Sequence, residues 1–270
     1  MQSLNNPENA ADQYRDSSNL RARVQLHDRF STNPQGWIPW VFDQLHLRPH
    51  SKILELGSGP GGLWQRNLDR IPEKCSILLT DFTEGMVREA RQTLEGKGDF
   101  EFRIVDANTT PLPFADSSFD TVIANHMLYY VSDRQGLFSE IVRVLKPGGR
   151  FYTSTIGRRH LIEIVEWISE FDPAAGATWG HPMSAADSFT LENGEAQLTP
   201  WFHDIRLFRY DDALVVNEVT PLLDYIFSGW TDLEEDRRKL FGEFLTRKMK
   251  GQAGTLHITK DSGIFEAVRR

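Results

Sequence analysis

The fold of this chain is decided by one stretch of its sequence, Glu55-Leu56-Gly57-Ser58-Gly59-Pro60-Gly61-Gly62. It ends an apolar run that begins at Ile53 and is typical of a buried strand. Glycines at this point let the backbone turn sharply and approach a ligand closely. Two spacings fit: Gly57, Gly59 and Gly62 match the dinucleotide pattern G-x-G-x-x-G, while Glu55 opens the pattern E-x-G-x-G-x-G. A turn with no ligand is the third interpretation.

Strands and helices alternate on the carboxyl side of this loop. Amphipathic helical patterns separate the apolar runs, and Pro147-Gly148-Gly149 is expected to end the last helix. This alternation predicts an α/β fold with a doubly wound, mostly parallel sheet that helices cover on both faces. After the strand at 53–56, the expected strands are 76–80, 100–105, 121–124 and 150–154.

The rest of the chain is expected to complete a single domain. Residues 1–48 predict a helical N-terminal arm, 49–156 the core, 157–250 a helical insertion that covers the substrate, and 251–270 a closing hairpin. The turn signal Asp261-Ser262-Gly263 predicts that 255–258 and 264–268 pair with each other. Helices are expected at 161–171, 189–202, 222–227 and 233–249, and a strand at 204–210.

Composition excludes several classes of function. The 270 residues include 30 Lys and Arg against 38 Asp and Glu, a formal charge of −8, which disfavours nucleic acid and anionic membranes as partners. The basic cluster Arg237-Arg238-Lys239 with Arg247-Lys248-Lys250 keeps a nucleic-acid substrate as an alternative. The single Cys75 rules out an internal disulfide, and no metal motif is present. Without a membrane span or signal peptide in the sequence, we expect a cytoplasmic protein.

Motifs that follow the loop choose between its interpretations. Asp81 ends the second strand, Asp106-Ala107 ends the third, and Asn125 ends the fourth. Together with the glycine loop, the segments Pro113-Phe114 to Val122 and Glu140 to Gly149 resemble the class I S-adenosylmethionine-dependent methyltransferases over residues 52–156. That resemblance implies a seven-stranded, Rossmann-like sheet with one antiparallel strand, and S-adenosylmethionine as cofactor. The alternatives are an NAD(P)-dependent oxidoreductase and a non-catalytic protein that binds S-adenosylmethionine.

The resemblance also implies a role for each matching position. Glu55, Gly57, Gly59 and Gly61 would hold the methionine part of the cofactor, Asp81 its ribose hydroxyls, and Asn125 would lie near its ammonium group. The adenine would be bordered by Phe82, Met86, Asp106 and Ala107. An N-terminal helix cap is the alternative role for Asp81, and an ordinary core position is the alternative for Phe82 and Met86.

The acceptor site is less defined by the sequence. His126 and Tyr130 are the candidate catalytic residues because they follow the fourth strand, where ligands meet open α/β sheets. His160, Glu163, His181 and Tyr129 are weaker candidates, and the aromatic residues of the cover suit a small-molecule substrate. We expect the arm to close over the site as a lid, with Tyr14, His27 or the pair Arg21 and Arg23 reaching it; a static brace is the alternative.

Overall fold

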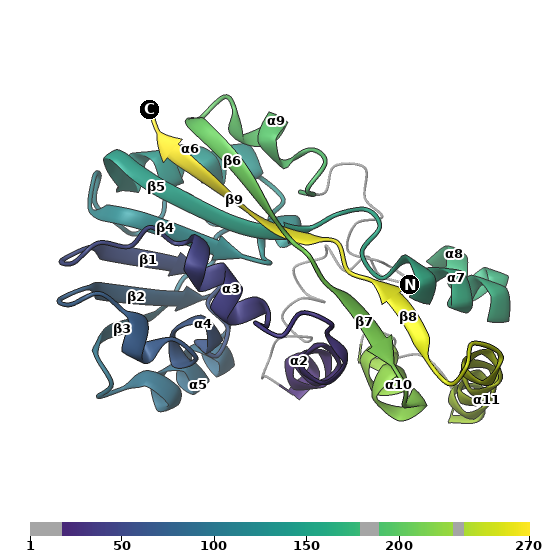
Figure 1. Cartoon of the computed structure of the whole chain (residues 1–270). Helices are drawn as coiled ribbons and strands as arrows, with labels where there is room; N and C mark the ends of the chain where they lie inside the picture. Colours follow the sequence, from purple (N-terminus) through teal and green to yellow (C-terminus); the bar gives the residue numbers. More distant parts are fainter. Residues whose placement is uncertain (1–17, 179–188, 229–234) are drawn as a thin grey trace.

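The structure is a computed structural model that describes residues 18–178, 189–228 and 235–270 (Figure 1). Seven strands form its main sheet, in the order β3-β2-β1-β4-β5-β9-β6. The predicted strand at Ile53 is β1, the middle one of the five strands β3-β2-β1-β4-β5 that pair in parallel. The strands are β1 (Lys52–Leu56), β2 (Ser76–Asp81), β3 (Asp99–Ile104), β4 (Phe119–Asn125), β5 (Leu145–Ile156), β6 (Phe202–Tyr210) and β9 (Ser262–Arg269).

Strand β9 is the antiparallel member of this sheet. It lies between β5 and β6 and runs antiparallel to both, whereas β1 to β5 pair with one another in parallel. Its residues from Ser262 to Ala267 are all buried, as expected for a strand covered on both faces. The predicted seven-stranded, mostly parallel sheet with one antiparallel strand is therefore confirmed.

The predicted closing hairpin is wrong. Strand β8 (Leu256–Thr259) pairs with β7 (Ala213–Val216) in a separate two-stranded sheet, not with β9. The β6–β9 pairing stops at Tyr210 and Ser262, and the β7–β8 pairing resumes at Ala213 and Thr259. One antiparallel ribbon thus leaves the main sheet and continues beyond it, so the turn residues at 261–263 make a bend and not a reversal (Figure 1).

Helices cover both faces of the main sheet. On one face, α3 (Trp37–Gln44), α4 (Gly62–Gln65) and α5 (Glu84–Leu94) bury residues such as Phe42, Trp64 and Leu94 against the strands. On the other face, α6 (Arg134–Val144) and α9 (Gly194–Leu198) bury Phe138 and Leu198. The doubly wound arrangement follows because each helix has one apolar stripe to bury.

A second hydrophobic core lies beyond the carboxyl ends of the parallel strands. We call the part of the molecule around this core the cover lobe (Figure 1). Its helix α2 carries Leu26 and Phe30 into the core, so the N-terminal arm shares a core with segments far along the chain. The elements of the cover lobe are α2 (Ser18–Phe30), α7 (Ile162–Phe171), α8 (Pro173–Thr178), β7, α10 (Val219–Phe227), α11 (Glu235–Gly251) and β8.

The structure differs from the sequence prediction at two helix ends and at one additional strand. Helix α6 ends at Val144, and the segment Pro147-Gly148-Gly149 lies inside β5, at an irregularity in its pairing with β4. The helix predicted over 189–202 is reduced to the five residues of α9, because Phe202 already belongs to β6. Strand β7 was not predicted, since four residues are too few for a periodic pattern.

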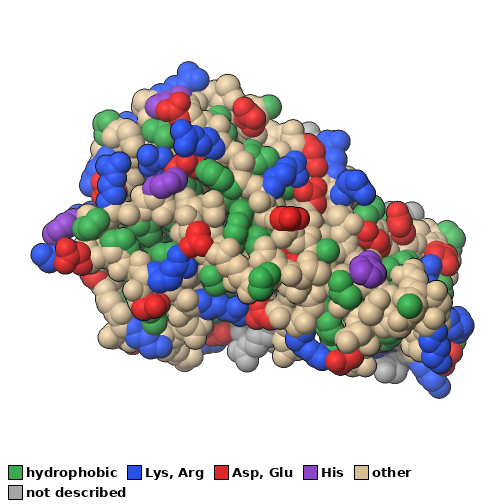
Figure 2. Space-filling view, in the orientation of Figure 1, with side chains coloured by type: hydrophobic (Ala, Val, Ile, Leu, Met, Phe, Trp, Pro, Cys, Tyr) green, Lys and Arg blue, Asp and Glu red, His purple; other side chains and the backbone are tan. Residues whose placement is uncertain are grey.

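Three of the six residues of the basic cluster on α11 form ion pairs within the protein. Arg237 pairs with Asp172, Arg238 with Asp224 at 2.7 Å, and Lys248 with Glu170 at 2.7 Å. Figure 2 shows basic and acidic side chains interspersed on the visible face. In the described part of the chain, no helix is long and apolar enough to cross a membrane.

Candidate active site

The predicted cofactor residues converge at one edge of the sheet. Strands β1, β2 and β4 are parallel and end at Leu56, Asp81 and Asn125. In open α/β sheets, ligands bind in the crevice outside such carboxyl ends. The loop that follows β1 is held to β2 by the Ser58 N–H, which donates to the Thr80 carbonyl at 2.9 Å.

The glycine loop has the backbone that its composition predicts. Gly57, Gly59 and Gly61 all have positive φ angles, of 66°, 54° and 80°. A Cβ at Gly57 would stand 3.0 Å from the Met127 Cβ, and one at Gly61 would stand 2.7 Å from the Leu94 Cδ1. The structure thus gives Gly61 a packing role between α4 and α5, and its role toward a cofactor stays a prediction.

Glu55 lies beneath this loop with its side chain 2% exposed. Its carboxyl accepts a hydrogen bond from the Trp64 indole N–H at 2.6 Å, and the Asn125 side chain also bonds to it. Burial raises the pKa of Glu55 to about 8, against these hydrogen bonds, and the charge of Asp81 adds to the increase. No cationic side chain pairs with Glu55 in the described ranges. It is therefore a buried acid that lacks a positive partner.

Asp81 ends β2 and ties the loop to the next helix. Its carboxylate accepts hydrogen bonds from the Gly59 N–H at 3.0 Å and the Thr83 N–H at 3.1 Å. Burial raises the pKa of Asp81, while these hydrogen bonds oppose the increase. The helix cap of α5 is Thr83, whose hydroxyl accepts from the Met86 N–H at 3.4 Å. Asp81 supports the cap and is not the cap itself.

The residues predicted to border the adenine differ in their exposure. Phe82 is 37% exposed and Asp106 is also exposed, with one carboxylate oxygen accepting the Asn108 N–H at 2.8 Å. Met86 and Ala107 are buried, Ala107 within the core that α6 covers. Phe82 and Asp106 are accessible to a ligand, and the adenine contacts of all four remain predictions.

The segment after β4 places its candidates close to the arm. Asn125 has a buried Oδ1 that lacks a hydrogen-bond partner among the described residues. His126 follows with a φ of 51°, its N–H bonded to the Ser154 carbonyl at 3.1 Å and its ring 5.1 Å from the Trp37 ring. Burial lowers the pKa of His126 to about 4, and the charge of Lys260 adds to the decrease. The imidazole is therefore neutral at pH 7, and the same burial and charge make it a weaker base than an ordinary histidine.

Tyr130 and the weaker candidates have structural partners or lie outside the described residues. Tyr130 packs against Tyr129 at a ring distance of 4.6 Å in the turn after β4. His160 accepts the Asp261 N–H at 3.1 Å, and Glu163 accepts the Thr259 N–H at 2.8 Å, so both join α7 to the ribbon. Tyr14 and His181 lie outside the described residues, and only the backbone is described for Arg21 and Arg23.

Sequence reasoning missed the residues that approach His126 from other elements. Trp37 was expected only as part of the arm, and nothing in the sequence connects it with Tyr210 or with the buried pair Lys260 and Asp212. Lys260 and Asp212 are 48 residues apart in the chain. The sequence shows only that Asp212 precedes one short apolar run and that Lys260 follows another. Charged residues that flank apolar runs are common on protein surfaces.

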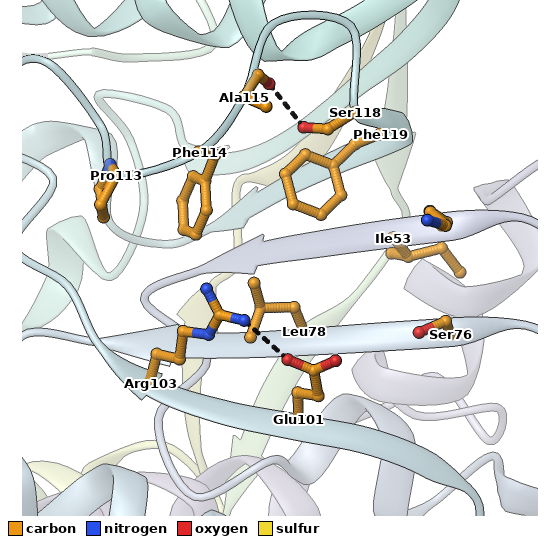
Figure 3. Close-up of a pocket in the computed structure, with 11 residues that line it drawn as sticks. Ile53, Ser76, Leu78, Glu101, Arg103, Pro113, Phe114, Ala115, Ser118 and Phe119 are labelled. Carbon is orange, nitrogen blue, oxygen red and sulfur yellow. Dashed lines mark hydrogen bonds and ion pairs between the residues drawn. The ribbon is translucent and has the colours of Figure 1, made fainter.

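The pocket in Figure 3 does not coincide with the candidate active site. It has a volume of about 250 Å³ and includes Lys52 and Ser76, which begin β1 and β2, so it opens toward the amino ends of these strands. The chain between β3 and β4 crosses this face as a loop, and the ion pair between Glu101 and Arg103, at 2.9 Å, borders the pocket. No predicted site residue lines it.

Replacing Glu55 with Gln is expected to stabilise the ligand-free protein at high pH. Between pH 4.5 and about 8 the folded protein keeps a proton on Glu55 that the unfolded chain has lost, so stability falls as pH rises through this range. Glutamine keeps an acceptor for the Trp64 N–H without a charge. We expect similar stability of the two proteins at pH 5 and a gain of roughly 3–5 kcal/mol at pH 9, the linkage value for a pKa raised from 4.5 to about 8. Urea unfolding at both values measures this; a constant difference would contradict the assigned pKa.

Metal binding has no support from the described ranges, 18–178, 189–228 and 235–270. They contain no group of three or more His, Cys, Asp or Glu side chains that could hold a metal ion. The candidate site consists of a glycine loop, buried acids and a neutral imidazole.

Comparison with known proteins agrees with this geometry. Residues 54–153 match a family described as a methyltransferase domain. The ubiquinone/menaquinone biosynthesis C-methyltransferase UbiE of Shewanella piezotolerans is 32% identical over 115 residues, and that of Vibrio cholerae is 34% identical over the same length. These matches cover 42% of this chain and 46% and 44% of the two relatives. The chain thus matches less than half the length of these relatives.

Solved structures share the fold over more of the chain. The YcgJ protein of Bacillus subtilis has a TM-score of 0.57 at 18% identity and covers 86% of this chain and 97% of its own. A putative methyltransferase of Haloferax volcanii, in complex with the Trm112 methyltransferase activator, has a TM-score of 0.59 at 18% identity, over 96% and 95%. A phosphoethanolamine N-methyltransferase of Haemonchus contortus, in complex with S-adenosyl-L-methionine, has a TM-score of 0.58 at 18% identity. The match covers 98% of this chain and 59% of that protein. The family match over residues 54–153 and the fold shared with these structures agree: the sheet core of this chain has the class I, Rossmann-like methyltransferase fold.

Proposed function

We propose that this protein is an S-adenosylmethionine-dependent methyltransferase that acts on a small molecule. The observation that carries the proposal is Glu55, a buried acid without a cationic partner, next to the unpartnered Oδ1 of Asn125. A ligand with a positive charge would favour ionised Glu55 and supply a donor for Asn125. S-adenosylmethionine has both an ammonium and a sulfonium group.

A dinucleotide fits this loop less well. The pyrophosphate of NAD binds at a helix N-terminus, where backbone N–H groups meet its negative charge. Here the helix after the loop, α4, has only four residues, and the carboxyl of Glu55 is buried beneath the loop. Asp81 does not discriminate, because dinucleotide sites also use a carboxylate at this position for the ribose. The methyltransferase family match and the methyltransferase relatives also favour S-adenosylmethionine and do not support the oxidoreductase alternative.

Each predicted residue has a task in the proposed reaction. S-adenosylmethionine supplies a methyl group on a positively charged sulfur, which a nucleophile can displace in line. The backbone at Gly57 and Gly59 would hold the methionine part, and Asp81 would accept from the ribose hydroxyls. His126 would take a proton from an acceptor that arrives protonated because of its position after β4, although its lowered pKa makes it a weak base in the ligand-free protein. Alignment of donor and acceptor can lower the barrier by about 7–11 kcal/mol.

A thermal-shift measurement tests the cofactor. We expect S-adenosylhomocysteine to raise the melting temperature and NAD and NADP to leave it unchanged, because only a ligand that binds the folded state stabilises it. Stabilisation by NAD alone would contradict the proposal. Binding of S-adenosylhomocysteine without methyl transfer to any of a broad set of acceptors would favour the non-catalytic alternative.

Replacing His126 with Asn is expected to lower kcat by about 10²–10⁴-fold for an acceptor that must lose a proton, because the base is removed. Asparagine tolerates positive φ well, so the turn after β4 should persist. The matched control is His50→Asn, since His50 is exposed and has a φ of 63° in a loop before β1. Cofactor affinity should be equal in both variants. Equal kcat in both would exclude His126 as the base.

The small-molecule acceptor is supported by the formal charge of −8 and by the ion pairs that use the basic residues of α11. The relatives named above act, by their names, in ubiquinone and menaquinone biosynthesis. Absence of a nucleic-acid substrate and a location in the cytoplasm remain predictions.

A further inference from the structure

Strand β3 forms one edge of the main sheet, and among the described residues its outer side has no pairing partner (Figure 1). It pairs only with β2, in an uninterrupted parallel register. The Val105 N–H donates to the Asp81 carbonyl at 3.0 Å, on the side of β2. Because successive residues of a strand direct their backbone groups to opposite sides, the N–H and C=O groups of Phe100, Phe102 and Ile104 point away from the sheet. They form a row of unpaired donors and acceptors.

The opposite edge of the sheet, β6, has a protective irregularity that β3 lacks. The pairing of β6 with β9 shifts register between His203 and Arg206, and Asp204 has a φ of 48° at this point. Bulges, proline and unpaired charges keep edge strands from pairing with other chains. Strand β3 contains neither proline nor a bulge, and its Glu101 and Arg103 pair with each other at 2.9 Å (Figure 3). The edge at β3 is therefore open to another strand.

The sequence of β3 is complementary to itself in the antiparallel direction. With Phe102 at the centre, Phe102 would face Phe102 of a second copy, and Phe100 would face Ile104. These residues have outward N–H and C=O groups, so each such pair can exchange backbone hydrogen bonds. Glu101 would face Arg103 at the positions without hydrogen bonds, where side chains of neighbouring strands are closest. Opposite charges would thus meet twice, once on each side of a two-fold axis.

The same pairing would cover exposed apolar surface. Ile104 is 57% exposed, and Phe100 and Phe102 are only partly buried on the face of β3 that α5 covers. Pairs of aromatic and aliphatic side chains across neighbouring strands stabilise a sheet. Arg91 of α5 lies 5.2 Å from the Phe102 ring centroid and pairs with Glu95 at 3.9 Å. The surface around β3 thus combines apolar side chains with charges of both signs, as a self-complementary interface requires.

We propose that β3 is an interaction surface for a second copy of this chain, whose own β3 adds in the antiparallel direction and joins the two seven-stranded sheets into one. The two-fold axis would pass beside Phe102, perpendicular to the sheet. Since the strands of the two copies then run in opposite directions, their candidate active sites would lie at opposite edges of the joined sheet.

The mass of the full chain in solution tests this surface. Sedimentation equilibrium over protein concentrations of about 1–200 µM should give a mass that rises toward, or already equals, twice the 30.9 kDa of one chain. A mass of one chain at every concentration overturns the proposal. S-adenosylhomocysteine is absent from these measurements, so their outcome does not depend on the proposed function.

Reversal of single charges locates the contact. Glu101→Arg and Arg103→Glu would each bring like charges together twice, so each variant alone should associate about tenfold or more weakly than the unsubstituted chain. A mixture of the two variants should recover the original affinity, because the two arginines of one chain then face the two glutamates of the other. Neither variant keeps the ion pair within β3, so this recovery can come only from pairing between chains.

The matched control is Arg206→Glu, which makes the same charge change on β6, at the other edge of the sheet, and should leave association unchanged. Hydrogen exchange gives a second measurement. In the mixture, the amides of Phe100, Phe102 and Ile104 should exchange more slowly than in either variant alone, whereas the amides of β6 should not differ. Undiminished association of either β3 variant alone, or a mixture that does not recover, overturns the proposal.

Discussion

Leu26→Ala is expected to lower the free energy of unfolding by about 2–5 kcal/mol, the range for removing a buried leucine side chain without refilling its space. Leu26 is 0% exposed and packs in the core of the cover lobe with Phe30 and with residues of α7, α10 and α11. Only partial collapse is possible there, since neighbours on all sides belong to fixed elements. Urea unfolding measures the change.

Val24→Ala is the matched control for this substitution. Val24 lies on the same helix with 37% of its surface exposed, so its loss should change stability by no more than about 0.5 kcal/mol. The comparison also tests the role of the arm. A large loss of stability with intact cofactor affinity per folded molecule means that α2 is a brace. Reduced turnover or cofactor affinity per folded molecule, in addition to the loss of stability, would mean that α2 acts as a lid.

Asp81→Ala is expected to weaken S-adenosylmethionine binding by about 1.5–3 kcal/mol, the range for hydrogen bonds to a charged group. The structure adds a second reason, since Asp81 also accepts the Gly59 N–H and so holds the glycine loop in place. The fold should persist, because Asp81 ends a strand and its burial already disfavours its charge. Calorimetry measures the affinity.

The matched control removes a carboxylate at the other end of the sheet. Asp99 is exposed and begins β3, so Asp99→Ala should leave cofactor affinity unchanged. Equal affinity of the Asp81 variant and the control would mean that the cofactor is misplaced. If the melting temperature also decreases strongly, binding is measured below the unfolding transition, so that a loss of affinity is not confused with a loss of folded protein.

Most of the sheet could be predicted from the sequence because its signals are local. Strands β1, β2 and β4 are short apolar runs bounded by polar or glycine residues, and the loop at Gly57, Gly59 and Gly61 needs positive φ angles that glycine adopts without strain. Parallel pairing then brings Asp81 and Asn125 to the same edge. The positions of these residues therefore depend on local sequence signals and on the parallel pairing of the strands.

The closing strands could not be predicted in the same way. The turn residues at 261–263 do form a local bend, but the same residue types occur in bends and in hairpin turns. Pairing of β9 with β5 and β6 satisfies the hydrogen bonds of both its edges, whereas a hairpin with β8 would satisfy one. Such a choice depends on which partners are available in space.

The sequence by itself determined where the strands of the parallel core lie in the chain, the glycine loop and the acids around it, because apolar period, glycine and strand ends act over a few residues. Only the tertiary structure decided that α2 shares a core with α10 and α11, that Trp37 contacts His126, and that Lys260 is neutralised by Asp212 where the ribbon leaves the sheet. These contacts join distant segments, and their energies come from burial, which no single segment determines alone.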